Sequence, residues 1–148
     1  MTKFLDFIFN PGVRLVYLHR LVYWLFRYKV FRGFSLILWQ IEVLLFATHI
    51  SPRCYIPKST VFPHPTGIVI GDHVLLGENV VIYQNVTIGV KRRTDKVYPQ
   101  INDDVIIYAG AVVVGKIEVG QASKIGANSF VAASVAENTI IKPLVSHN

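Results

Sequence analysis

The strongest constraint on this chain is a six-residue repeat that continues unbroken from residue 101 to residue 142. An aliphatic residue recurs at every sixth position: Ile101, Ile107, Val113, Val119, Ile125 and Val131. Six is neither the helical period nor a strand alternation. The pattern predicts a chain that winds in flat-sided coils, in which each side is a short strand and the aliphatic residues stack inward. Such coils bury a core only by stacking on their neighbours.

The same frame continues backward to Ile50 and is interrupted at two places. Two extra residues lie around His64-Pro65-Thr66-Gly67, and seven extra residues lie between Val90 and Gln100. Insertions in a repeat scaffold become surface loops and often carry function. We therefore expect the chemistry of this chain at these two interruptions.

Length and composition predict one folding unit in a reducing compartment. The chain has 148 residues, 52% of them hydrophobic and 16% charged, which a thin repeat domain with a hydrophobic oligomer interface would explain. Its one cysteine, Cys54, falls at an inward repeat position, so no internal disulfide can form and a small core residue is expected. A cytoplasmic protein fits this cysteine usage.

The charge is basic and unevenly distributed, with a formal net value of +6. Residues 1–50 carry six basic and two acidic side chains, and the inserted loop adds Lys91, Arg92, Arg93 and Lys96 against Asp95. No base-stacking module or zinc-ligand spacing accompanies these charges, so neither nucleic acid nor a metal is expected. An anionic small ligand or an anionic membrane surface fits better.

Two short helices are expected ahead of the repeats, which divides the chain into a helical segment, 1–48, and a repeat domain, 49–148, with a loop insertion at 90–100. The apolar run of the second helix, Phe34 to Phe46, is thirteen residues long, short of the roughly 20 that span a bilayer. The helices either pack on the coils or on a partner subunit, or they lie as a basic, aromatic pair on the inner face of the plasma membrane.

Several segments resemble those of bacterial serine acetyltransferases, over about residues 11 to 132. These segments are Pro11-Gly12 with Tyr17-Leu18-His19-Arg20, the strand Thr66 to Gly71 directly after His64, the coil Ile82 to Gly89, and the coils Tyr108 to Ala111 and Lys124 to Ala127. The resemblance implies a mainly β fold, a left-handed parallel β-helix of hexapeptide repeats preceded by two short helices. It further implies a homotrimer with active sites between subunits and acetyl-CoA as the donor.

His64 matches the general base of that family. A hydroxyl is a poor nucleophile at neutral pH, so a group must remove its proton as it attacks the thioester carbonyl. Imidazole titrates in the range that this step needs. The alternative is a loop histidine that only caps a turn between Pro63 and Pro65.

Other candidate site residues also follow from the resemblance. The coenzyme-binding coils imply that small residues let the coenzyme approach the backbone and that lysines meet its phosphates; the candidates are Gly89, Ala109, Lys124, Ala127 and Lys142. Each lysine could equally be a solvated corner charge. The substrate-binding candidates are Asn85, Tyr98 and His49, although Asn85 could be a corner residue with left-handed dihedrals. His49 could orient His64 or could simply end a helix.

The departures from the family concern its serine-binding groups. The aspartate expected fifteen residues before the base is His49, the aspartate just before the base is Pro63, and an Arg-His-Pro string reads Val97-Tyr98-Pro99. The acidic helical domain that precedes the matched region in the family is expected to be missing. Without these groups the charges of bound serine would stay unpaired at a high cost, whereas a neutral sugar hydroxyl would not need them.

We therefore expect an acetyl-CoA-dependent O-acetyltransferase that acts on a sugar hydroxyl in capsule, O-antigen or exopolysaccharide synthesis. The alternative acceptor is L-serine, which would make the protein a serine O-acetyltransferase of cysteine biosynthesis. A third possibility is a catalytically silent β-helix that serves as a structural or binding trimer. His64 and the coenzyme-type coils argue against this third possibility.

Overall fold

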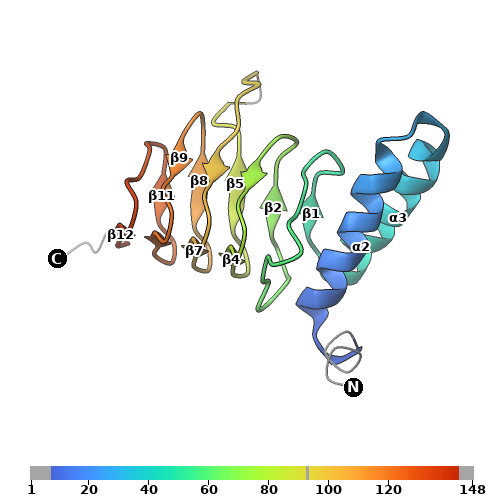
Figure 1. Ribbon diagram of the computed structural model, residues 1–148, viewed down its shortest axis with the longest axis horizontal. Helices are drawn as coiled ribbons and strands as arrows, with labels where there is room; N and C mark the ends of the chain where they lie inside the picture. Colours follow the sequence, from blue (N-terminus) through green and yellow to red (C-terminus); the bar gives the residue numbers. More distant parts are fainter. Residues whose placement is uncertain (1–7, 93, 144–148) are drawn as a thin grey trace.

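A pair of helices caps one end of a tapering stack of β-coils in the computed structural model, which describes residues 8–92 and 94–143 (Figure 1). Helix α2 covers Pro11–Phe26, a 3-10 turn η1 covers Lys29–Phe31, and helix α3 covers Arg32–Phe46. The first strand, β1, begins at His49. Arg93 of the predicted basic loop lies outside the described residues.

The strands are short and every pairing between them is parallel. They are β1 His49–Ile50, β2 Val69–Ile70, β3 Leu75–Leu76, β4 Val81–Ile82, β5 Thr87–Gly89, β6 Gln100–Ile101, β7 Ile106–Ile107, β8 Val112–Val114, β9 Glu118–Val119, β10 Lys124–Ile125, β11 Phe130–Val131 and β12 Ile140–Ile141. The sheet orders are β1-β2-β5-β8-β11, β12-β10-β7-β4 and β3-β6-β9. The chain visits the three sheets in turn, so the predicted left-handed parallel β-helix is confirmed.

The strand register reproduces the sequence frame. Ile70 pairs with Ile88, and Val113 with Val131, at a spacing of eighteen residues per coil. Ile50 pairs with Ile70 at twenty residues, and Ile88 with Val113 at twenty-five. The two longer spacings contain the two predicted insertions, which are therefore loops between coils. The last coil departs from the frame in the other direction, because Val119 pairs with Val135 and Ile125 with Ile141 at only sixteen residues. The prediction that the repeat continues unbroken to residue 142 is therefore wrong at its end.

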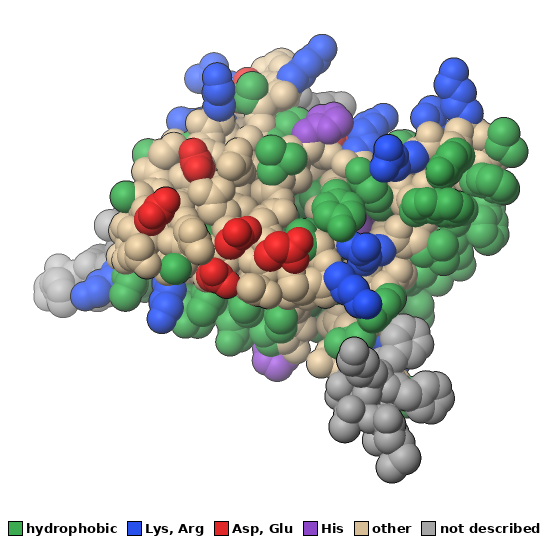
Figure 2. Space-filling model, viewed as in Figure 1, with side chains coloured by type: hydrophobic (Ala, Val, Ile, Leu, Met, Phe, Trp, Pro, Cys, Tyr) green, Lys and Arg blue, Asp and Glu red, His purple; other side chains and the backbone are tan. Residues whose placement is uncertain are grey.

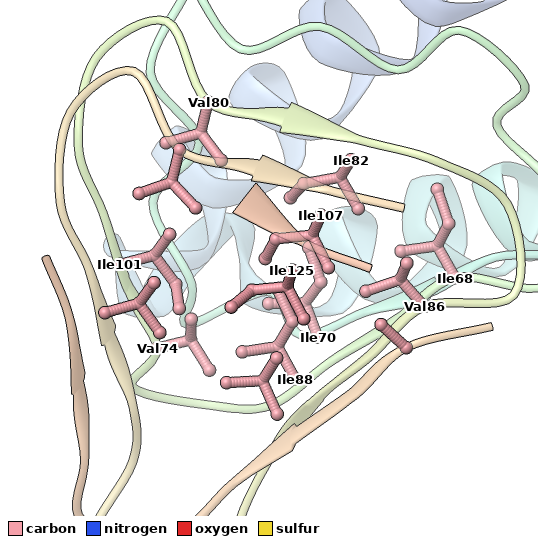
Figure 3. Close-up of a cluster of buried hydrophobic side chains, with 14 of the residues drawn as sticks. Ile68, Ile70, Val74, Val80, Ile82, Val86, Ile88, Ile101, Ile107 and Ile125 are labelled. Carbon is pink, nitrogen blue, oxygen red and sulfur yellow. The ribbon is translucent and has the colours of Figure 1, made fainter. Parts of the chain in front are cut away.

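The core is a column of stacked aliphatic side chains (Figure 3). Ile70, Ile82, Ile88, Ile107 and Ile125 have at most 1% of their surface exposed. Burying each such side chain contributes about 1.5–3 kcal/mol. The corners between strands hold residues in the left-handed conformation, which asparagine tolerates well; the described asparagines of this kind are Asn79, Asn85, Asn128 and Asn138.

Local signals explain where helix α2 begins and how α3 is attached to the coils. The side chain of Asn10 accepts hydrogen bonds from the backbone N–H groups of Gly12 and Val13 and caps α2, whose first residue is a proline. Both features favour a helix start. The Trp39 indole N–H donates to the carbonyl of Ile50 at 2.7 Å, so α3 is attached directly to the first coil.

Candidate active site

His64 lies at a corner of the β-helix where successive coils pass from the four-stranded sheet to the five-stranded sheet. At this corner the backbone N–H of Asn85 donates to Thr66, that of Gly110 to Gln84, and that of Asn128 to Ala109. The segments 64–67, 83–85, 108–110 and 126–128 therefore stack in one column, here called the His64 corner. The fold gathers His64, Asn85, Ala109 and Ala127 along a single edge, although 63 positions of sequence separate the first from the last.

Two tyrosines form an aromatic surface next to His64. The rings of Tyr83 and Tyr108 stack with centroids 5.4 Å apart and an interplanar angle of 23°. The Tyr83 ring also lies 6.4 Å from the His64 ring. His64 is solvent-exposed, so its imidazole can meet a substrate that rests against these rings.

Asn85 has a clear structural role at this corner. Its φ is 58°, and its amide oxygen fills the space that a Cβ on Gly67 would need. Gly67 itself has a φ of 66°. Gly67 and Asn85 come from neighbouring coils, and Gly110 and Asn128, also from neighbouring coils, show the same arrangement. This pairing of glycine and asparagine therefore belongs to the scaffold. The proposed contact of Asn85 with a substrate stays a prediction.

The predicted coenzyme residues fall partly on this corner. Ala109 and Ala127 occupy neighbouring coils of the column. Ile125 pairs with Ile141, so Lys142 follows β12 as Gly126 follows β10 and stands at the same edge. Lys124 projects from β10 on the four-stranded sheet and is exposed. These positions outline a strip that runs from His64 toward the last coils.

Tyr98 lies at a different corner. Its ring contacts that of His73 edge-on at 5.5 Å and packs against Gly71, where a Cβ would come within 2.9 Å of the ring. Gly71 follows β2, whereas His64 precedes it, so the five-stranded sheet separates Tyr98 from His64 within one chain. Gly89 ends β5 near the Tyr98 side, with open space where a side chain would be.

His49 is exposed at the start of β1. Its ring contacts the Trp39 ring edge-on at 4.9 Å, and it lines a surface hollow together with Arg53 and Asp72. No hydrogen bond joins His49 to His64 in the described part of the chain. Within the described part of a single chain, no contact supports the prediction that His49 orients His64.

The Asp72 carboxylate in that hollow is held ionised. The hydroxyl of Ser51 donates to it at 2.6 Å, and Arg53 donates to its other oxygen at 2.8 Å. The Ser51 hydrogen bond is the largest cause that lowers the pKa of Asp72, and the Arg53 contacts lower it further against partial desolvation. Within residues 8–92 and 94–143, no three His, Cys, Asp or Glu side chains cluster closely enough to hold a metal ion.

Sequence reasoning did not single out Tyr83 and Tyr108 as a pair. Their separation of twenty-five residues equals one coil plus the seven-residue insertion. Counting along the frame would have put them at equivalent corner positions. Gln84, which lies between Tyr83 and Asn85 in the sequence, was also missed. Its buried amide oxygen has no hydrogen-bond partner among the described residues.

Comparison with known sequences gives serine acetyltransferases as relatives. The serine acetyltransferase of Mycobacterium tuberculosis (strain ATCC 25618 / H37Rv) is 37% identical over 88% of this chain and 57% of its own length. That of Staphylococcus aureus (strain Mu50 / ATCC 700699) is 34% identical over 92% of this chain and 64% of its own length. The chain thus spans less than two thirds of these relatives. No protein-family model matches the sequence.

Solved structures of serine acetyltransferases share the fold. The enzyme from Brucella abortus strain S19 superposes with a TM-score of 0.87 at 32% identity, over 96% of this chain and 58% of its own. A serine acetyltransferase in complex with CoA superposes with a TM-score of 0.80 at 32% identity, over 88% of this chain and 53% of its own. The Neisseria gonorrhoeae enzyme in complex with serine superposes with a TM-score of 0.84 at 28% identity, over 92% of this chain and 56% of its own.

Proposed function

Because this chain is a homologue of serine acetyltransferases over about nine-tenths of its length, we propose that it is an acetyl-CoA-dependent O-acetyltransferase with His64 as general base. The observation that carries the proposal is the His64 corner. An exposed histidine, two small residues and a lysine stand along one edge of the coils, in the order that a base, a thioester arm and a phosphate group would need.

The chemistry requires one proton to move twice. His64 accepts the proton of the acceptor hydroxyl while that oxygen forms a bond with the acetyl carbonyl carbon. The tetrahedral intermediate collapses as the carbon–sulfur bond breaks, and the protonated imidazole returns the proton to the departing thiolate. Neighbouring donors stabilise the oxyanion between these steps.

The coenzyme would lie along the strip of the His64 corner. Ala109 and Ala127 leave room for the pantetheine arm, and Lys142 and Lys124 offer cations to the phosphates. The serine acetyltransferase solved with CoA supports this assignment of the donor. Gly89 would leave space near the Tyr98 side of the site.

A homotrimer would complete the site. His64 and Tyr98 lie at opposite edges of the five-stranded sheet, so they can face one ligand only if Tyr98 comes from a neighbouring copy. Apolar side chains exposed on the coil faces, Val61, Val69, Leu75, Phe130 and Ile140, would be covered in such an assembly.

L-serine is the acceptor that the comparisons favour. The relatives are serine acetyltransferases, and one solved homologue is a complex with serine. The polysaccharide acceptor expected from the sequence has no such support. L-serine is therefore the first acceptor to assign to this site.

A sugar hydroxyl remains a second candidate because of one observation. The rings beside His64 belong to Tyr83 and Tyr108, and the positions that would hold charged serine-binding groups are Pro63, Val97 and Tyr98. Stacked aromatic faces suit the apolar face of a sugar ring.

The test is an acetyl-CoA consumption assay on the purified full chain, with L-serine beside a panel of sugars and sugar nucleotides. We expect O-acetylserine to form. His64→Ala should lower kcat by about 100-fold or more, the range for loss of a general base, with an unchanged melting temperature. Near-normal turnover by His64→Ala would overturn the role of His64. Sugar acetylation without O-acetylserine would replace L-serine as acceptor.

A further inference from the structure

Helix α3 is inverted: it buries polar side chains and exposes apolar ones. Ser35 and Glu42 are fully buried, whereas Ile37 is 60%, Leu44 81% and Leu45 67% exposed. A surface helix of a globular protein normally shows the opposite pattern. The apolar face of α3 therefore points away from the protein.

Specific hydrogen bonds fix this orientation. The Ser35 hydroxyl donates to the carbonyl of Val22 on α2 at 2.8 Å. The Glu42 carboxylate lies 3.1 Å from His19 Nδ1, also on α2. Ser35 and Glu42 are seven residues apart and so share one face of the helix. Rotating α3 to bury its apolar face would remove the hydrogen bonds that Ser35 and Glu42 make with α2.

Helix α2 extends the apolar surface. Leu21 and Trp24 on α2, and Tyr28 just after its end, are about half exposed. Leu21 also lines a groove with Leu45 and Phe46 of α3, so the exposed stripes of the two helices meet. Figure 2 shows hydrophobic side chains covering this end of the molecule, with basic ones at the turn between the helices.

The exposed charges that the two helices and their turn carry are all basic. Residues 8–46 contain Arg14, Arg20, Arg27, Lys29 and Arg32, and their one carboxylate is the buried Glu42. Arg27, Lys29 and Arg32 cluster at the turn, where the Arg32 guanidinium lies 5.0 Å from the Phe26 ring. An apolar surface with a cationic rim and aromatic residues is typical of helices that lie at a lipid interface.

We propose that the α2–α3 pair docks on an anionic lipid bilayer, with its apolar face in the acyl boundary and its basic turn at the headgroups. No helix within the described residues is long and apolar enough to cross a membrane, so the pair would lie along the surface. A second copy fits less well, because a contact between two such faces would bring like charges together. The inner leaflet of a plasma membrane is a surface of the required charge.

The test is sedimentation of the full chain with phosphatidylcholine vesicles, with and without phosphatidylglycerol. We expect binding only to the anionic vesicles and release by salt. Arg27→Gln/Lys29→Gln/Arg32→Gln should weaken binding on the order of 100-fold, because each basic residue near such a surface contributes a factor of about five. Lys116→Gln/Lys124→Gln/Lys142→Gln also removes three positive charges, but from the coils and not from the helices. This variant should bind like the unmodified chain.

Three further variants separate the lipid contact from other occupants. Leu44→Glu should abolish vesicle binding, whereas Ala136→Glu, which adds the same charge at an exposed position on the last coils, should not. Trp24 emission should shift to the blue on anionic vesicles, and Trp24→Phe should lose the shift. Unchanged vesicle binding by Leu44→Glu would overturn the proposal. So would a lipid-free, concentration-dependent association that Leu44→Glu removes, which would identify a second copy as the occupant.

Discussion

The Glu42 carboxylate and the His19 imidazole form a fully buried pair, with Oε1 3.1 Å from Nδ1. The other ring nitrogen, Nε2, donates to the carbonyl of Cys54 at 2.9 Å. A carbonyl only accepts, so Nε2 carries a hydrogen, and a further hydrogen lies between Nδ1 and the carboxylate. This pair joins α2, α3 and the first coil in one polar contact.

Removing one member of this pair should be costly. Glu42→Ala leaves Nδ1 of the buried His19 without its partner, so we expect a loss of about 3–5 kcal/mol in the free energy of unfolding. Glu42→Gln should recover part of it, because an amide N–H can donate to Nδ1. Denaturant unfolding at one fixed protein concentration measures this. Glu137→Ala, at an exposed carboxylate on the last coils, should change stability by less than about 0.5 kcal/mol. Equal effects of Glu42→Ala and Glu137→Ala would contradict the pair's role.

Gly67 offers a second stability test at the His64 corner. Gly67→Ala would put a methyl group on the Asn85 amide oxygen at a φ of 66°, so we expect destabilisation of about 1–3 kcal/mol. Gly33→Ala is the matched control. It lies in α3 with nothing within 4 Å of the new methyl group, and helix propensity predicts a gain of about 0.5–1 kcal/mol. Thermal unfolding of both variants gives the comparison; a neutral Gly67→Ala would show that the corner can relax.

The repeat frame explains why the coils were predictable and the helix packing was not. Within a regular coil, an inward aliphatic residue such as Ile88 has its partner, Ile70, at the position that the period gives. Subtracting the insertion would likewise align Tyr83 with Tyr108. The contact between His19 and Glu42 follows no such period, because it depends on how two helices cross. The spacing of Ser35 and Glu42 did contain a signal, a polar face two turns long.

Loop positions show the same limit at the candidate site. The two frame breaks predicted that His64 and Tyr98 lie in loops between the coils. Their placement on opposite edges of one sheet depends on which corner each insertion occupies, and this emerges only when the coils are stacked. The relation between the two residues could not be obtained from spacing alone.

Cys54 predicts a stability change at alkaline pH. Burial, and to a smaller extent the charge of Asp72, raise the pKa of its thiol from 9.0 to about 12. The thiol is neutral when protonated, so the folded state holds this proton more tightly than the unfolded chain. Its contribution to stability is fully present below pH 9.0 and is lost as the pH rises toward about 12. Cys54→Val has no thiol to titrate, so its free energy of unfolding should fall less over this range than that of the unmodified chain. Parallel curves for the two proteins would contradict the raised pKa.

Tyr83 should affect catalysis through its contact with His64. Its ring lies between the His64 ring, at 6.4 Å, and the Tyr108 ring, at 5.4 Å, and aromatic contacts contribute about 0.5–1.5 kcal/mol each. Tyr83→Ala should therefore lower kcat/KM by up to about 10-fold, whereas Tyr83→Phe keeps the ring and should stay near the unmodified value. Tyr55→Ala is the control, because it also removes a surface tyrosine ring, but one that contacts Tyr23 and Arg20 on α2. Steady-state rates with acetyl-CoA and L-serine, beside melting temperatures, give the readout. If Tyr83→Ala and Tyr55→Ala lose activity equally, the ring acts through stability and does not position His64.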